Sequence, residues 1–283
     1  MADPAPYNAP AQPAAPEKKP VTLAELDAMR ARGEPITMLT CYDASFAALL
    51  ARAGVDTILI GDSLGMVIQG HSGTAKVTLE DIAYHTAAVV RGAPRALVIA
   101  DMPWNTYHGS PAQAFDSAAR LVAAGAQMVK MEGGEWLVPT TRFLAERGIP
   151  VCSHLGLLPQ TVASAGGYRV QGRDPAGAER IVNEARAHAE AGARMVLMEM
   201  IPDSLARRVT EAVSVPTIGI GAGPHVSGQV LVLYDILDVF PGKKARFVKN
   251  YLAATGNIEA AVRAYVSEVK AGAYPAKEHS FGG

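Results

Sequence analysis

Cysteine is scarce in this sequence, with two among 283 residues, Cys41 and Cys152. Each lies in an apolar run typical of a strand, so the sequence supports neither a disulfide framework nor a cysteine-rich zinc site. Also missing are a basic amino-terminal region followed by an apolar stretch, and any apolar run long enough to cross a bilayer. We therefore expect a reduced, cytoplasmic protein that is neither exported nor inserted in a membrane.

The sequence also lacks an excess of charge of either sign, because 26 Lys and Arg against 27 Asp and Glu give a formal net charge of −1. Without a basic run there is no electrostatic signature of nucleic-acid binding or of binding to an anionic membrane, so neither partner is expected. Hydrophobic residues are abundant, at 49%. This composition and length suit one large α/β domain with a substantial core.

The amino-terminal segment differs in composition from the rest. Residues 1–20 are rich in Ala and Pro, and we expect them to form a disordered tail because they cannot bury enough apolar surface. Directly after it, Thr22 and Glu25 have the spacing of a capping box. They predict a lead-in helix that ends at about Ala31.

Apolar runs that end in a polar or titratable residue recur along the chain, as in ILIGDSLGM at 58–66. Runs of this kind, bounded by glycine, are typical of strands buried on both faces. The predicted strands are Ile36–Cys41, Thr57–Asp62, Ala96–Ala100, Met128–Glu132, Pro150–His154, Arg194–Glu199, Pro216–Ile220 and Val230–Leu233. The helices predicted between and after them are Ser45–Ala53, Leu79–Arg91, Pro111–Ala124, Trp136–Arg147, Pro175–Ala191, Ser204–Ala212 and helical segments from Ala245 onward.

This alternation of strands and helices predicts a (β/α)8 TIM barrel over residues 21–283. Gly125 and Gly192, each after a predicted helix, are the usual stop signals before a strand. The main alternative is an open doubly wound sheet, which would carry a glycine-rich dinucleotide turn after its first strand. The sequence there is YDAS at 42–45, so we favour the barrel.

Three acidic residues end successive predicted strands: Asp62, Asp101 and Glu132. Taken singly, each is better explained as the partner of an arginine or as a helix cap. Together, at strand ends, they would repel one another without a cation, and carboxylate oxygens suit a hard ion such as Mg²⁺. The set therefore predicts a metal site.

Lys130 lies two residues before Glu132, so on a strand both side chains share a face. A buried ion pair between them is one interpretation. A Schiff-base lysine is another, but it needs a lowered pKa and tends to avoid carboxylates. We favour a third role, in which Lys130 binds a substrate carboxylate as a cation.

Three more residues at strand ends are candidates for the site. His154 is either a general acid or base, or a packing residue held by hydrogen bonds. Glu199 follows an apolar run, where a carboxylate suits a general base, unless the fold brings it an arginine. Ser63 could bind a substrate carboxylate or cap the next turn, and no G-x-S-x-G elbow marks it as a nucleophile.

Several motifs resemble those of one family: GDSLG at 61–65, DIAYHT at 81–86, KMEGGEW at 130–136, HLGL at 154–157, GGYRVQG at 166–172 and GIGAG at 219–223. From about Thr37 to EHSF at 278–281 the chain closely resembles the ketopantoate hydroxymethyltransferases, although the segment 72–76 departs from their pattern. The resemblance implies a barrel related to the phosphoenolpyruvate mutase group and a role in pantothenate biosynthesis. It implies Mg²⁺ as cofactor, 3-methyl-2-oxobutanoate as acceptor, 5,10-methylenetetrahydrofolate as one-carbon donor, and a homo-oligomer, typically a decamer.

The resemblance also implies roles for individual residues. The metal site falls on Asp62, Asp101 and Glu132, the oxo-acid contacts on Asp62, Ser63, Asp101 and Lys130, and the proton acceptor on Glu199. His154 is kept as a further candidate for substrate binding. The implied chemistry is removal of the C3 proton by Glu199, which gives an enolate stabilised by Mg²⁺ that attacks the folate-derived methylene group.

Two other classes of protein stay open. A lyase of the phosphoenolpyruvate mutase or isocitrate lyase kind should carry a catalytic cysteine in a loop, whereas Cys41 and Cys152 both fall in predicted strands. A binding barrel without catalytic activity would keep the cavity and lose the base.

Overall fold

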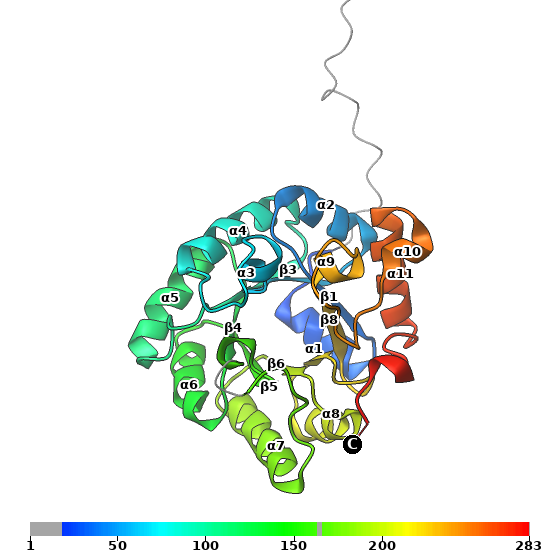
Figure 1. The fold of residues 1–283 in the computed structure, drawn as a ribbon. Coiled ribbons are helices and arrows are strands. Elements are labelled where there is room, and N and C mark those ends of the chain that lie inside the picture. The colour runs from blue at the N-terminus through cyan, green and yellow to red at the C-terminus, as the bar shows by residue number, and fades with distance from the viewer. Residues whose placement is uncertain (1–18, 163–165, 283) are drawn as a thin grey trace, which may run out of the picture.

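The computed structural model describes residues 19–162 and 166–282. Its strands β1 to β8 are parallel and follow one another in chain order around a closed barrel, with helices outside (Figure 1). Because β8 pairs with β1, the sheet has no open edge. The predicted TIM barrel is confirmed and the open sheet was the wrong alternative. Most of the predicted disordered tail, residues 1–18, lies outside the described residues.

The strands are short and their bounds are close to the predicted ones. They are β1 (Ile36–Thr40), β2 (Thr57–Ile60), β3 (Leu97–Asp101), β4 (Met128–Glu132), β5 (Val151–Gly156), β6 (Met195–Glu199), β7 (Thr217–Ile220) and β8 (Gly228–Leu231).

The α-helices of the described residues are α1 (Leu23–Ala31), α2 (Ala44–Ala53), α3 (Leu64–Val67), α4 (Leu79–Gly92), α5 (Pro111–Ala123), α6 (Val138–Glu146), α7 (Pro175–Glu190), α8 (Asp203–Ala212), α9 (Leu233–Ile236), α10 (Tyr251–Thr255) and α11 (Ile258–Lys270). Short 3-10 helices are η1 (Glu135–Leu137), η2 (Pro159–Thr161) and η3 (Lys277–His279). No helix among the described residues is long and apolar enough to cross a membrane.

The last strand was predicted two residues too late. A Cβ atom at Gly228 would lie 2.3 Å from the carbonyl oxygen of Ile36, so only glycine permits the close approach with which β8 begins. Leu233, predicted to end this strand, begins α9 instead, and its amide donates to Thr40 Oγ1 at 3.0 Å.

Two other predicted boundaries need correction. The helical segment expected from Ala245 begins at α10, after the cap residue Asn250. Cys41, expected inside the first strand, directly follows β1 and is fully buried.

The lead-in helix α1 closes the amino-terminal end of the barrel. Its N-cap is as predicted, since the Thr22 side chain accepts from the Glu25 amide. The Glu25 carboxylate does not complete the capping box and pairs with Arg32 at 2.6 Å instead. Leu26 and Met29 pack into the same apolar cluster as the inward side chains of the strands. In Figure 1 this helix lies across the centre of the ring.

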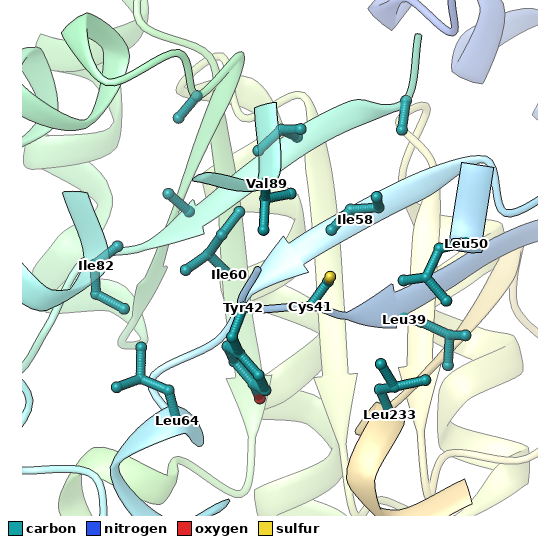
Figure 2. Packing of buried hydrophobic residues seen from close by; sticks show 14 of the residues in the cluster. Leu39, Cys41, Tyr42, Leu50, Ile58, Ile60, Leu64, Ile82, Val89 and Leu233 are labelled. Atoms are coloured by element: carbon teal, nitrogen blue, oxygen red, sulfur yellow. The ribbon is translucent and has the colours of Figure 1, made fainter. Parts of the chain in front are cut away.

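The strands alternate between two faces, as strand geometry requires. Outward side chains of β1 and β2 pack against α2 and α4, and Figure 2 shows Ile58 and Ile60 with Leu50, Ile82 and Val89. The inward side chains are apolar near the amino-terminal ends of the strands. On the same inner face, polar side chains stand at the carboxyl-terminal ends of the strands, which we call the carboxyl rim. This alternation places the candidate site residues.

Candidate active site

The register of the sheet brings the polar strand ends side by side. Asp101 on β3 is opposite Lys130 on β4, and Glu132 on β4 is opposite His154 on β5. Glu199, at the end of β6, is opposite Gly156. The predicted site residues Asp62, Ser63, Asp101, Lys130, Glu132, His154 and Glu199 all line one pocket at this end of the barrel.

Lys130 lies at the centre of a buried charge cluster. Its Nζ is 2.7 Å from Asp101 Oδ1 and 3.6 Å from Glu132 Oε1. Burial lowers the pKa of Lys130, but the surrounding carboxylates, Asp101 foremost, outweigh burial and raise it above its ordinary value. The side chain is therefore an ammonium cation, and the predicted sharing of one face with Glu132 is confirmed.

The carboxyl groups of the cluster differ in how strongly their surroundings disfavour the ionised form. Burial raises the pKa of Asp62 well above its ordinary value, and repulsion from Asp101 and Glu132 raises it further. Burial also raises the pKa of Asp101, against the opposing charge of Lys130. For Glu132, by contrast, the charges of His154 and Lys130 outweigh burial and lower the pKa. An added cation would therefore stabilise the ionised form of Asp62 more than that of the other two acids.

His154 connects the charge cluster to Glu199. Its Nδ1 is 3.2 Å from Glu132 Oε1 and its Nε2 is 3.5 Å from Glu199 Oε2. Burial and the Lys130 ammonium both lower the pKa of His154, but the carboxylates of Glu132 and Glu199 outweigh them and raise it to about 9. These carboxylates therefore favour the imidazolium form of His154, against the Lys130 Nζ that lies 3.3 Å from Nδ1.

Glu199 is more accessible than the rest of the charged cluster, with a side chain 13% exposed against 2% for His154. Among the described residues, the cationic partner of Glu199 is His154. The sequence alone left an arginine open as that partner. Gly156 permits this arrangement: it has φ +90°, and a Cβ there would lie 2.3 Å from the Glu199 carbonyl oxygen.

Ser63 does not cap the helix that follows it. The residue precedes α3, yet its side chain makes no capping hydrogen bond. Its Oγ lies 2.8 Å from the Tyr42 hydroxyl, which holds it at the pocket wall. Of the two roles predicted for Ser63, capping of the next turn is wrong, and binding of a substrate carboxylate stays a prediction.

Gln160 and Tyr107 are parts of the site that sequence reasoning missed. The Gln160 side-chain amide donates to Asp62 Oδ2 at 2.9 Å, and its backbone amide donates to Glu132 Oε2 at 3.0 Å. Its side-chain oxygen accepts from the Tyr107 hydroxyl at 2.7 Å. One residue of η2 therefore orients two of the predicted metal ligands, and no motif around it in the sequence signals this.

The residues present suit a hard cation in the atoms that they offer. Asp101 Oδ1 and Glu132 Oε1 are buried oxygens whose partners are cationic side chains: Lys130 Nζ is 2.7 Å from the first, and His154 Nδ1 is 3.2 Å from the second. No three acidic, histidine or cysteine side chains of residues 19–162 and 166–282 already surround a common metal position. The site thus supplies oxygen donors and uncompensated negative charge without a preformed coordination shell.

Neither cysteine is placed for nucleophilic catalysis. Cys152 lies on β5 and Cys41 just after β1, and both are fully buried. Burial raises the pKa of each thiol to about 12. A thiolate, the reactive form, is therefore disfavoured at both positions.

Comparison with known proteins identifies the family of the chain. Residues 20–277 match the family model for ketopantoate hydroxymethyltransferase. A relative in Burkholderia multivorans, named 3-methyl-2-oxobutanoate hydroxymethyltransferase, is 60% identical over 261 residues, which cover 92% of this chain and 96% of that protein. A relative of the same name in Burkholderia thailandensis is also 60% identical, with the same coverage.

Solved structures share the fold at much lower identity. Phosphonopyruvate hydrolase, in complex with oxalate and Mg²⁺, has a TM-score of 0.59 and 17% identity, and the match covers 91% of this chain and 92% of that one. A 2,3-dimethylmalate lyase of the phosphoenolpyruvate mutase/isocitrate lyase superfamily has a TM-score of 0.55 and 18% identity, with 89% and 88% covered. These likenesses concern the barrel alone, whereas the family model and the close relatives extend over nearly the whole sequence. The chain therefore belongs to the ketopantoate hydroxymethyltransferase family of enzymes.

Proposed function

We propose that this enzyme transfers a hydroxymethyl group from 5,10-methylenetetrahydrofolate to 3-methyl-2-oxobutanoate, giving 2-dehydropantoate in the first step of pantothenate biosynthesis. Its family membership supports the reaction class. The observation that carries the proposal is the position of Glu199, an accessible carboxylate beside a buried cluster with cations at Lys130 and His154. Such a site can bind an anion and remove a proton next to it.

Three acids are proposed to hold Mg²⁺, namely Asp62, Asp101 and Glu132. The bound ion would supply Lewis acidity that polarises the 2-oxo group of the substrate and eases loss of the neighbouring proton. These three buried carboxyl groups outnumber the cationic side chains beside them, Lys130 and His154, and this excess of acidic groups supports the assignment. Gln160 would keep Asp62 and Glu132 oriented through its two hydrogen bonds.

The protein groups then have separate tasks. The Lys130 cation binds the carboxylate of the oxo acid, with Ser63 at the adjoining wall. Glu199 accepts the proton from C3, and His154 Nε2, 3.5 Å from Glu199 Oε2, holds this carboxylate in position. The resulting carbon nucleophile forms a bond to the donor's methylene carbon, which gives up its bonds to N5 and N10 of the folate and takes its hydroxyl oxygen from water. Tetrahydrofolate leaves with the proton removed from C3 and one proton of that water.

Isotope exchange tests this function without the donor. The protein, with Mg²⁺ and 3-methyl-2-oxobutanoate deuterated at C3, should release deuterium to water in the absence of folate, and adding the donor should yield 2-dehydropantoate. A chelator provides the matched control. A barrel that only binds ligands would show neither activity, and inertness toward this oxo acid would exclude the proposed reaction.

We also propose that the enzyme works in the cytoplasm as a homo-oligomer, the decamer typical of its family. Trp104 and Trp136 support an interface, since large aromatic side chains that are 45% and 54% exposed are characteristic of contact surfaces. Native mass spectrometry should give ten times the chain mass of 29.6 kDa. A monomeric mass at micromolar concentration would contradict the assembly.

A further inference from the structure

The pocket above the charge cluster is larger than a small 2-oxo acid requires. Its volume is about 770 Å³, in the upper part of the range for pockets that bury drug-sized ligands, roughly 300–1,000 Å³. The oxo acid would occupy only the floor, next to Lys130 and Glu199. The remaining volume can hold a second, larger ligand at the same time.

The two ends of this pocket carry opposite charges. Its floor is formed by the acids of the strand ends, whereas its outer wall includes Lys243, Lys244 and Arg246. These three cations belong to the segment between α9 and α10, which we call the basic segment, residues 243–247. A ligand that extends from floor to mouth would therefore meet positive charge at its outer end.

Two of the three cations are available to a ligand. Lys244 is engaged, with its Nζ 3.4 Å from Asp238 Oδ1 and 3.8 Å from Asp235 Oδ1. Lys243 is exposed and makes no ion pair within the described residues. Arg246 donates from Nε to the Glu278 carbonyl at 2.8 Å, and its guanidinium lies over the Phe281 ring, 5.8 Å from the centroid. Its terminal nitrogens make no hydrogen bond among the residues described.

Aromatic rings line the same outer wall. Phe240, Phe247 and Phe281 all contribute to the pocket. Gly221, at the end of β7, makes room for two of them, because a Cβ there would lie 2.6 Å from Phe247 and 3.1 Å from Phe281. Flat ligands stack favourably on such ring faces.

We infer that the basic segment, with Phe240 and Phe281, is the subsite for the one-carbon donor. This rests on the proposed function and assigns residues to its second substrate. The donor's aromatic rings would pack against the phenyl groups, with the methylene carbon directed to the floor. The carboxylates of its glutamyl tail lie at the mouth, on Lys243 and Arg246.

Charge reversal at the mouth tests the assignment. The double variant Lys243→Glu/Arg246→Glu should raise KM for the donor roughly tenfold or more, a loss of about 1.4 kcal/mol per factor of ten. The increase should be larger for a triglutamyl donor than for the monoglutamyl form. KM for the oxo acid and the donor-independent exchange at C3 should stay at wild-type values, which also shows that the variant is folded.

Arg186→Glu is the matched control, since it reverses a charge on the exposed face of α7, away from the pocket lining. It should leave both KM values unchanged. An unchanged donor KM in the double variant would overturn the subsite while leaving the proposed function intact, and so would a rise in KM for the oxo acid alone. Absence of exchange and transfer in the wild-type enzyme would instead refute the proposed function itself.

Discussion

Among single residues, Glu199 separates chemistry from binding most clearly. Glu199→Gln keeps the volume and much of the hydrogen bonding but cannot accept a proton. We expect Mg²⁺ and oxo-acid binding to persist while C3 exchange and product formation fall together by about 10²–10⁴-fold. Calorimetry and deuterium exchange on the one variant measure both properties.

The control for this variant is Glu211→Gln, an exposed substitution on α8. If Glu199 is only the structural partner of His154, its variant should lose stability and substrate affinity before it loses chemistry, because a buried charge is left unpaired. A stable variant that binds substrate and exchanges at the wild-type rate would point to His154 as the base.

Lys130 is expected to act as a cation and to form no imine. The carboxylates beside it raise its pKa, so the neutral amine required for Schiff-base formation is scarce. Borohydride treatment in the presence of the oxo acid should leave the mass of the protein unchanged relative to a sample without oxo acid. A reduced adduct mapped to Lys130 would replace this mechanism with covalent catalysis.

Sequence reasoning located these residues because a strand carries its side chains on alternate faces and a parallel barrel collects strand ends at one rim. The same reasoning could not find Gln160. Its bond to Asp62 joins residues 98 positions apart, across a connection without regular periodicity. The link from His154 to Glu199 was likewise hidden, because it depends on how β5 and β6 align.

At the scale of elements, α7 fixes the loop that follows β4, the strand that ends in Glu132. His188 on α7 is fully buried, with Nδ1 3.0 Å from Thr141 Oγ1 and Nε2 3.1 Å from the carbonyls of Gly133 and Gly134. Facing two carbonyls, Nε2 carries a proton, and because burial lowers the pKa of His188 the neutral ring is favoured, in which Nδ1 accepts from Thr141. This helix thereby holds the backbone next to Glu132.

A pH dependence of stability follows from this contact. Burial lowers the pKa of His188 below its ordinary value of 6.5, so the unfolded chain takes up a proton more readily than the folded one. The stabilisation is complete above about pH 6.5 and is lost as pH falls through the lower pKa of the folded state. Against His188→Gln, the wild-type advantage in unfolding free energy should narrow between pH 7 and 5.

Denaturant titrations at several pH values measure this difference, and His225→Gln, which changes an exposed histidine between β7 and β8, is the control. At pH 8 the His188 variant should be destabilised by about 1–3 kcal/mol, the usual cost of unpaired buried polar groups. An advantage that stays constant down to pH 5 would show that His188 does not titrate as argued.

Element boundaries were predictable where local chemistry sets them and missed where tertiary contacts do. The caps at Thr22 and Thr78 are readable in sequence and begin α1 and α4. The start of β8 at Gly228 depends instead on the approach of β1, which no local pattern reports. The short helix α3 was missed because the glycines around it suggest a loop.

The whole molecule is a barrel with one closed end. Its class was predictable from the alternation of apolar strands and helices, together with the missing glycine-rich turn after the first strand, which disfavoured an open sheet. That the lead-in helix seals the amino-terminal end was not, because its Leu26 and Met29 could equally have packed on the outside. This apolar cluster closes the barrel below the pocket, which is lined by the residues at the carboxyl ends of the strands.

A pocket whose acidic floor lies beneath an outer wall imposes an order on ligand binding. If the oxo acid occupies the floor and the larger donor the space above it, as proposed, a bound donor blocks access to the floor. Steady-state kinetics should therefore be ordered, with the oxo acid first to bind and 2-dehydropantoate last to leave. Product inhibition checks this: 2-dehydropantoate should compete with the oxo acid, whereas tetrahydrofolate should give mixed inhibition against both substrates. Pure competition between tetrahydrofolate and the donor would instead indicate random entry.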